Sequence, residues 1–412
     1  MPQPSTFHAK QGWTSLLAEG LEDDRPWAHI AVHSPEAMAA LLKQCSDAGA
    51  KLFVGRPRPL PGSLSAASIV FADVTPLNAV VEHRQADQVI SLQCGMKLAQ
   101  LDKLLEKSGQ WWPIAGGRDD TVYDIIANGD GGWLEQGFSG PRHLILGLEL
   151  ALPNGNLIKT GGKVVKNVTG YDLTKLIVGG RSLFGIPTVA HLRLFARPER
   201  CACLVVKSAR LQELVQHASV LLASGLPIAV LEIMQSNLLA DVGLADLGVN
   251  DGSYTTIVQV FEHDPVIAEV MPQLQSLAAP HMVQSAFVVK VGSQLVDLAA
   301  PRDRIEISCA LSHVEDVVEI GQRFGCTNLR LRPACGRLRF DLTPEVDVTA
   351  MRKALSKMCC ERGRTMTLAT TEGFVFKVRH LPDTESAASD IVAEIKKQFD
   401  PSGCLNPLAS FQ

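Results

Sequence analysis

The stretch GGKVVKNVTGYDLTKLIVGGRSLFG, residues 161–185, carries the strongest information in this chain. It contains two glycine pairs and a cluster of polar side chains, and it ends on a glycine directly before Ile186-Pro187. Glycine has no Cβ and tolerates positive φ, so such a concentration of glycine is typical of backbone that must adopt special conformations. Just before the stretch, Pro153-Asn154-Gly155 predicts a hairpin between strands at 146–152 and 157–159.

Further upstream, the chain alternates between helical and strand patterns. Ser34 followed by Pro35 is typical of a helix start, and the next apolar residues share one helical face until Gly49. Residues 115–140 are rich in Gly and Asp, and they predict a long functional loop with one short helix. Short apolar runs predict strands at 52–54, 69–74 and 89–94.

Downstream of Arg197-Pro198 the pattern changes to that of a second, α+β domain. A hairpin around Gly336 is predicted, and a last helix is predicted over 386–399. Strands are predicted at 203–206, 255–261 and 305–310, alternating with amphipathic helices at 211–222 and 314–324.

Composition excludes several classes of protein. The 412 residues suggest two domains, and 46% hydrophobic with 20% charged residues is an ordinary globular balance. A net charge of −4 gives no electrostatic case for nucleic acid, and no transmembrane segment or secretory signal is evident. The ten cysteines lack the spacing of iron–sulfur or zinc ligands, so we expect reduced thiols and no metal. The expected location is the cytoplasm, with contact to the inner membrane only through partners.

Four blocks of sequence resemble FAD-linked oxidases of the vanillyl-alcohol-oxidase type, and among them the E subunits of bacterial glycolate oxidases. The blocks are residues 73–113, residues 138–162 with the S-G-P-R segment, the opening stretch with KNVTGYDLTKL, and FDPSGCLNP at 399–407. The resemblance implies an α+β chain with three parts. A PCMH-type FAD-binding domain of two α/β subdomains would cover residues 1–197. An α+β cap domain would cover 198–384, and a C-terminal segment, 385–412, would return to the FAD-binding domain.

The resemblance also implies where FAD binds, since a pyrophosphate needs N–H groups from glycine-rich loops. The cofactor-binding residues predicted in this way are Gly55, Arg56, Arg58, Gly62, Thr121, Val122, Ser139, Gly140, Lys166, Gly170, Tyr171, Asp172, Gly185, Ile186 and Asn406.

Three loops depart from the glycine pattern of that family. VGRPRPLPGS, residues 54–63, keeps two glycines, and its three prolines remove N–H donors that Arg56 and Arg58 could replace. In the second loop Tyr123 and Asp124 stand where the family has two glycines, and a carboxylate there would repel a pyrophosphate. In the third, SLFG at 182–185 keeps only the final glycine of G-T-L-G.

The function implied by the resemblance is oxidation of a small 2-hydroxy acid, glycolate to glyoxylate, within a complex. Its partners would be a larger FAD-containing catalytic subunit and an iron–sulfur subunit. Two alternatives stay open: a flavin-free structural subunit with a degenerate FAD site, and a stand-alone flavoenzyme with another substrate. No catalytic residue is assigned from the sequence.

Several single residues have both a functional and a structural interpretation. Asp172 suits a helix N-cap, and Arg142 suits either a carboxylate ligand or a pair with an acidic neighbour. Trp111-Trp112 are expected to pack the domain, and His380 is the candidate general base, although a lone histidine is more often structural.

Overall fold

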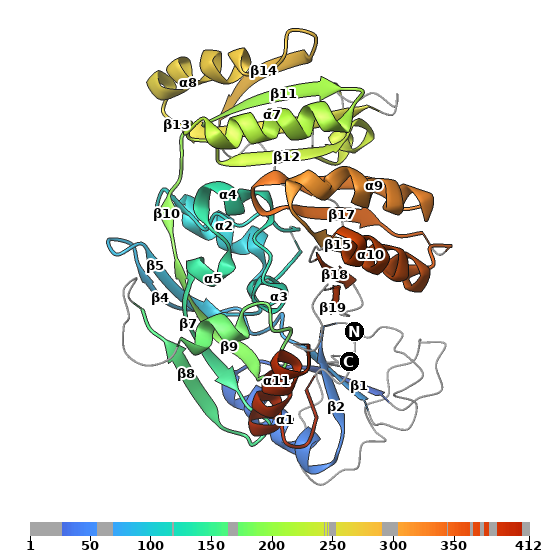
Figure 1. Cartoon of the computed structure of the whole chain (residues 1–412). Coiled ribbons are helices and arrows are strands. Elements are labelled where there is room, and N and C mark those ends of the chain that lie inside the picture. Colours follow the sequence, from blue (N-terminus) through green and yellow to red (C-terminus); the bar gives the residue numbers. More distant parts are fainter. Residues whose placement is uncertain are drawn as a thin grey trace.

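The computed structural model describes most of the chain and has an α+β fold. The described residues are 27–55, 69–117, 119–163, 172–242, 244, 246, 253–290, 304–343, 345–362, 366–370, 375–378 and 385–405. The described strands form one nine-stranded sheet and three smaller sheets, the smallest of which pairs β6 (Gln110–Trp111) with β10 (Phe195–Ala196). Figure 1 shows the large sheet with its helices toward one end of the molecule and the five- and three-stranded sheets toward the other. Within the described residues, no helix is both long and apolar enough to cross a membrane.

The first small sheet is parallel, with the strand order β1-β3-β2. Helix α1 packs close to it because its apolar residues, Met38 and Leu42 among them, recur on one buried face. As predicted, Ser34 caps this helix by accepting a hydrogen bond from the Ala37 N–H. The bounds are Trp27–Ala31 for β1, Pro35–Asp47 for α1, Lys51–Val54 for β2 and Ile69–Asp73 for β3.

The second small sheet is antiparallel, with the order β4-β5-β9-β7-β8, and it shares one apolar core with the first. Its strands β7 and β8 form the hairpin predicted around Asn154-Gly155. The bounds are Val80–Arg84 (β4), Val89–Gln93 (β5), Ile145–Ala151 (β7), Leu157–Gly161 (β8) and Ile186–Arg193 (β9). Helices α2, Leu98–Glu106, and α6, Leu173–Ile177, accompany them.

The segment predicted as a long loop with one short helix is mostly helical, so that expectation was wrong. It contains α3 (Val122–Asn128), a 3-10 turn (Gly132–Leu134) and α4 (Glu135–Phe138), and α5 (Pro141–Leu144) follows. The helices are short and have no apolar periodicity long enough to reveal them. Instead they are fixed at their ends: Thr121 caps α3 at one end, and Gly129 takes the left-handed conformation at the other, with φ of 66°.

The nine-stranded sheet has helices on one face and the small-sheet domain on the other (Figure 1). Its order is β14-β11-β13-β12-β16-β17-β15-β18-β19, with antiparallel pairing throughout. The strands are Arg200–Ser208 (β11), Val230–Gln235 (β12), Tyr254–Glu262 (β13), Val283–Lys290 (β14), Arg304–Ser308 (β15), Thr327–Arg332 (β16), Arg337–Asp341 (β17), Met366–Thr370 (β18) and Val375–Val378 (β19). The helices are α7 (Leu211–Ala223), α8 (Asp264–Ser276), α9 (Val314–Arg323) and α10 (Val348–Arg362).

The last helix, α11 (Glu385–Phe399), lies against the small-sheet domain rather than the nine-stranded sheet (Figure 1). After it, the Leu52 N–H donates to the Cys404 carbonyl at 2.9 Å, and Leu52 pairs with Leu405 in a parallel bridge. The Asp400 carboxylate accepts the N–H groups of Cys404 and Leu405. The domain boundaries predicted from the sequence stay predictions.

Candidate functional site

The nine-stranded sheet meets the small-sheet domain through two chemically different regions. The first, which we call the aromatic half, is an apolar cluster around Trp133, which is 2% exposed. Trp111 lies edge-on to Phe138, with ring centroids 5.1 Å apart, which confirms that Trp111 packs the core. The cluster comprises Trp111, Ala115, Trp133, Leu134, Cys203, Val205, Val230, Met234, Leu238, Leu239, Leu244 and Ile257.

The second region, the charged half, is built on the hairpin of β16 and β17. Arg330 lies opposite Arg339, and Arg332 lies opposite Arg337. Because strand residues alternate between faces, all four arginines share one face of the sheet. Three of them converge on Asp130, which lies between α3 and the 3-10 turn of the small-sheet domain.

Asp130 is the centre of this ion-pair network. Its carboxylate accepts from Arg332 Nη1 at 2.8 Å and Arg337 Nη1 at 3.3 Å, and it pairs with Arg339 Nη2. On the far side, Glu306 accepts from Arg339 Nε at 2.7 Å and lies 3.3 Å from Arg337 Nε. One carboxylate of the small-sheet domain therefore holds three cations of the opposing sheet.

Burial and charge act in opposite directions on the acids of the network. Burial alone would raise the pKa of Asp130, but Arg332, Arg339 and Arg337 hold that pKa well below its usual value. Glu232 has a raised pKa because burial outweighs its attraction to Arg332, whose Nε lies 3.9 Å away. Burial alone would lower the pKa of Arg332. The neighbouring Asp130 carboxylate raises that pKa above its usual value, so Arg332 stays charged.

A pocket of about 360 Å³ opens beside this network, between the two domains. Two residues predicted from the sequence, Ser139 and Gly140, line it from the small-sheet domain. Arg332 lines it from the nine-stranded sheet, and its side chain is only 7% exposed. We call this cavity the interface pocket; its other residues are Trp133, Glu135, Gln136, His143, Leu231, Ala334 and Cys335.

Two of the residues that line the interface pocket carry buried polar atoms without a hydrogen-bond partner. Arg332 has Nε and Nη2 unpartnered, and Gln136 has Oε1 unpartnered. Unmet buried donors and acceptors cost free energy, so these atoms are the candidates for contact with a ligand or water at this cavity. The pocket thus combines a cationic donor with a neutral acceptor. Glu135, the one carboxylate of the lining, is already engaged by the Gly131 N–H at 2.7 Å and lies 3.6 Å from Arg337.

The other predicted cofactor residues that the structure describes lie away from this pocket. Gly55 follows β2 with φ of 112°, a conformation that favours glycine, and within the part of the chain that the structure describes no heavy atom lies within 4 Å of the position its Cβ would take. The buried Ile186 begins β9, and Gly185 directly precedes it, where the missing Cβ avoids Leu152 and the Ala151 carbonyl.

The amino end of α3 does not fit a pyrophosphate. The Thr121 N–H donates to Asp124 Oδ2 at 2.8 Å, and the Asp124 N–H donates to Thr121 Oγ1 at 3.2 Å. The Val122 N–H donates to the Met96 carbonyl. Each of these amides, which a phosphate would need as donors, therefore already has a partner within the chain.

Asp172 and Arg142 make other contacts in the structure than those predicted from the sequence. Asp172 precedes α6 as expected for an N-cap, but its side chain makes no cap hydrogen bond and pairs with Lys175 at 3.2 Å. Among the described residues, Arg142 pairs with no acidic neighbour and donates to the Lys175 carbonyl at 2.5 Å, because a nearby helix end offers this carbonyl. Its interpretation as a carboxylate ligand stays a prediction.

Several predictions fall outside the described residues. These are Arg56, Arg58, Gly62, Lys166, Gly170, Tyr171, Asn406 and the candidate base His380. Sequence reasoning missed Asp130, Gln136 and Arg332. The alternating arginines in LRLRPACGRLRF, 329–340, and the Asp in NGDGG, 128–132, were the available signals.

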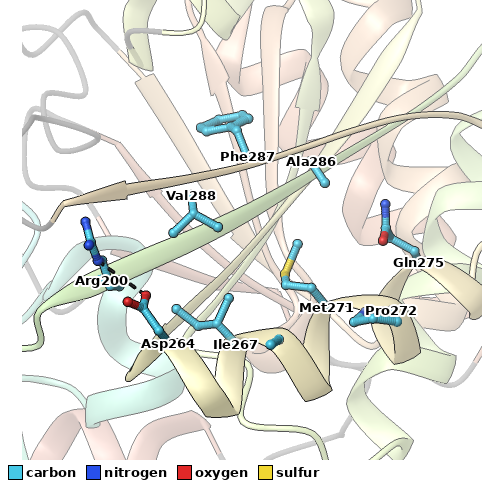
Figure 2. A pocket seen from close by; sticks show the side chains of 10 residues that line it. Arg200, Asp264, Ile267, Met271, Pro272, Gln275, Ala286, Phe287 and Val288 are labelled. Atoms are coloured by element: carbon cyan, nitrogen blue, oxygen red, sulfur yellow. Dashed lines mark ion pairs between the residues drawn. The ribbon is translucent and has the colours of Figure 1, made fainter.

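A second concave surface lies on the nine-stranded sheet, between α8 and the edge strand β14, and measures about 590 Å³. Figure 2 shows Ile267, Met271 and Pro272 of α8 facing Ala286 and Val288 of β14, with an ion pair between Arg200 and Asp264 at one end. That pair satisfies its own charges. This groove is larger than the interface pocket, but it has fewer polar groups and is built from the nine-stranded-sheet domain alone.

Comparisons with known proteins agree that the chain contains an FAD-binding domain and is similar to FAD-linked oxidoreductases. Residues 26–161 match the family model described as FAD binding domain. An uncharacterized FAD-linked oxidoreductase of Mycobacterium tuberculosis is 24% identical over 422 residues, which cover 91% of this chain and 88% of the relative. Glycolate oxidase subunit GlcD of Bacillus subtilis is 24% identical over 80% of this chain and 77% of its own length.

The chain is also similar to one further relative in sequence and to one solved structure. Glycolate oxidase subunit GlcE of Escherichia coli is 28% identical over 43% of this chain and 49% of its own length. A solved alkyldihydroxyacetonephosphate synthase has a TM-score of 0.66 at 12% identity, covering 91% of this chain and 75% of the other.

The resemblance predicted from the sequence, to FAD-linked oxidases with a PCMH-type FAD-binding domain, is confirmed. The α+β fold class is confirmed as well. FAD is the cofactor that the domain match and the FAD-linked relatives support. The engaged N–H groups at the amino end of α3 do not change this cofactor assignment. They affect only which residues of this chain could contact the FAD pyrophosphate.

Proposed function

We propose that this chain, whose residues 26–161 match an FAD binding domain, is a subunit of an FAD-linked complex that oxidises glycolate to glyoxylate. The observation that carries the substrate class is the interface pocket. Its unpartnered Arg332 Nη2 suits a carboxylate, and its unpartnered Gln136 Oε1 suits the hydroxyl of a small 2-hydroxy acid. FAD, when bound, supplies the acceptor for the two electrons of such an oxidation.

Each residue of the pocket has a defined task in this proposal. Arg332 binds and orients the substrate carboxylate through a charge-assisted hydrogen bond. Asp130 holds the guanidinium in place by accepting from Nη1, which leaves Nη2 for the ligand. Gln136 Oε1 accepts a hydrogen bond from the 2-hydroxyl, and Trp133 and Leu231 exclude water from one wall. A general base is not assigned.

The relatives support a complex rather than a stand-alone enzyme. Two of them are described as subunits of glycolate oxidase, GlcD and GlcE. On this basis the proposed partners are a larger FAD-containing catalytic subunit and an iron–sulfur subunit, which would take up the electrons. The proposed location is the cytoplasm, with contact to the inner membrane through those partners.

The substrate assignment is tested by steady-state kinetics on the complex purified with this chain. Arg332→Gln should raise the KM for glycolate about tenfold to a hundredfold, because a charge-assisted hydrogen bond in the pocket is lost. The matched control is Arg200→Gln, at the far groove, which should leave KM unchanged. An unchanged KM in Arg332→Gln would remove the pocket from the proposal.

A second candidate, a flavin-free structural subunit of the same complex, is favoured by one observation, the internally capped end of α3. The visible absorption spectrum of the chain, after incubation with FAD and gel filtration, separates the two candidates. Flavin bands near one per chain support the FAD-binding subunit, whereas a folded, colourless chain supports the structural subunit.

A further inference from the structure

Glu232 is a buried carboxylate that has no task in the proposed binding of the substrate. It lies in β12, is 1% exposed, and its Oε2 has no hydrogen-bond partner among the described residues. Ile233 lies opposite Leu331 where β12 pairs with β16, so Glu232 and Arg332 are the next pair along these strands. Glu232 Oε2 lies 3.9 Å from Arg332 Nε, which is longer than an N–H···O hydrogen bond. Two buried groups of opposite charge therefore lie side by side without a hydrogen bond.

The charges around Glu232 and Arg332 are balanced before any ligand binds. In the described part of the chain, ion pairs and close charges connect five guanidinium groups with five carboxylates. These groups are Arg181, Arg330, Arg332, Arg337 and Arg339, and Asp130, Glu135, Glu232, Asp241 and Glu306. A ligand carboxylate at Arg332 adds one negative charge for which this set holds no further cation.

The other neighbours of β12 do not change this balance. Strand β13 places the apolar Ile257 opposite Glu232. Helix α7, which carries the buried His217, packs with Leu231 and Ile233 on the opposite face of the strand.

Glu232 holds its negative charge less firmly than Asp130 does. Asp130 accepts hydrogen bonds from Arg332 and Arg337 and pairs with Arg339, and these cations keep its pKa well below the usual value. Burial raises the pKa of Glu232 in spite of the nearby arginines. A ligand carboxylate at Arg332 raises that pKa further, because two like charges then share one guanidinium.

We propose that Glu232 positions Arg332 for an anionic ligand and takes up one proton when a carboxylate binds there. This proposal rests on the proposed function, which places the substrate carboxylate at Arg332 Nη2. In the empty pocket the ionised Glu232 attracts the guanidinium from the Nε side, and Asp130 binds Nη1. When the ligand arrives, a proton moves from the solvent to a carboxylate oxygen of Glu232, so the net charge of the network is kept. No other bond is formed or broken in this step.

Ligand binding that takes up a proton weakens as pH rises. The affinity is highest below the pKa of Glu232 in the empty chain. It falls between that pKa and the higher pKa of the liganded chain, and it stays low above both. A ligand that raises the pKa of Glu232 by about one unit gives about a tenfold difference in affinity between the two ends.

The test is a calorimetric titration of the full-length chain with glycolate at several pH values from about 5 to 9. Each titration is carried out in two buffers of different ionisation enthalpy, because the difference in heat gives the number of protons taken up per ligand. The wild type should take up about half a proton at the midpoint between the two pKa values of Glu232.

Glu232→Gln keeps the shape of the side chain and cannot ionise. It should take up no proton, and at high pH it should bind glycolate about tenfold more tightly than the wild type. A gain in affinity is not expected from a residue that only stabilises the fold, and circular dichroism checks that the variant is folded.

The matched control concerns His143, a second titratable side chain at the interface pocket. His143→Gln should keep the proton uptake of the wild type. If Glu232→Gln does not fold, this control still decides. Uptake that persists without His143 supports the proposal, and uptake that is lost with His143 contradicts it.

The outcomes separate this proposal from the proposed function. Glycolate binding without proton uptake at any of these pH values would overturn the role of Glu232 and leave the substrate site intact. Acetate, which keeps the carboxylate and lacks the 2-hydroxyl, is titrated in parallel. Proton-linked binding of acetate without binding of glycolate would support the role of Glu232 and contradict the proposed substrate. Absence of binding by both anions would contradict both.

Discussion

The aromatic half and the charged half lie on the same face of the same sheet. The side chains of the aromatic half are fully packed, whereas the charged half keeps polar atoms without hydrogen-bond partners. In the aromatic half, side chains from both domains fill the space between them, and Trp133 is almost fully buried. In the charged half, the network satisfies Asp130 but leaves Nε and Nη2 of Arg332 without hydrogen-bond partners, with Glu232 3.9 Å from Nε. An interface that served adhesion alone would gain nothing from an incompletely paired guanidinium. We therefore propose that the aromatic half holds the two domains together and that the charged half binds the ligand.

The largest effect on stability is expected in the aromatic half. Trp133→Ala should lower the free energy of unfolding by about 3–5 kcal/mol, because it empties a fully packed site between the domains. Denaturant unfolding measures the loss, and Trp133→Phe, which keeps most of the ring, should lose clearly less. A loss below about 1 kcal/mol for Trp133→Ala is typical of a surface site and would contradict the assigned role.

The next effect is expected at the centre of the charged half. Asp130→Asn should cost about 3 kcal/mol, since two buried and one half-buried guanidinium groups lose their common anion while the amide still accepts one hydrogen bond. The matched control is Asp102→Asn. Its ion pair with Arg197 is more exposed, so less than about 1 kcal/mol should be lost. Equal losses in the two variants would mean that the network is not a stabilising centre.

The pH dependence of that difference sharpens the comparison. The pKa of Asp130 in the folded chain lies well below the value of 3.8 for an unperturbed carboxyl. Its contribution to stability is therefore complete above the unfolded pKa and is lost as pH falls through the folded pKa. The difference in Tm between wild type and Asp130→Asn should be constant from pH 7 to 5 and shrink below pH 4. A difference that grows on acidification contradicts the assignment.

The smallest effect on stability is expected at the rim of the interface pocket. Cys335 is exposed, whereas the other free cysteines of the described chain are buried. Iodoacetamide should alkylate Cys335 first among these residues, and glycolate at ten times its Kd should slow that reaction about tenfold by occupying the pocket. Peptide mass spectrometry measures both rates. Cys335→Ser should change stability by less than about 0.5 kcal/mol. Alkylation that glycolate does not slow places the ligand elsewhere.

Periodic patterns in the sequence predicted most of the fold. The Ser34 cap, the hairpin at Asn154-Gly155 and the hairpin at Gly336 all formed as expected, because each depends on neighbouring residues. The helices between residues 121 and 144 were missed since they are too short for apolar periodicity. Their ends are fixed by the Thr121 cap and by contacts such as that of Gly137, whose N–H donates to Ala229 of the opposing sheet domain.

The candidate site was harder to predict than the fold. Ser139 and Gly140 came from a local motif and do line the interface pocket. Arg332 and Asp130 are 202 residues apart in sequence, and nothing local to either indicates that they meet. The pairing of Tyr123 with Ser182 was equally invisible, although each residue stood out as a departure from the glycine pattern. A pattern along the chain identifies unusual residues, but only the folded structure shows which of them face each other.

The most direct test of the central claim is a calorimetric titration of the purified chain with glycolate, in the wild type and in Arg332→Gln. We predict one binding site in the wild type and at least a tenfold weaker Kd in Arg332→Gln, with Arg200→Gln equal to the wild type. Equal affinity in all three proteins would contradict the claim that the charged half binds the substrate carboxylate.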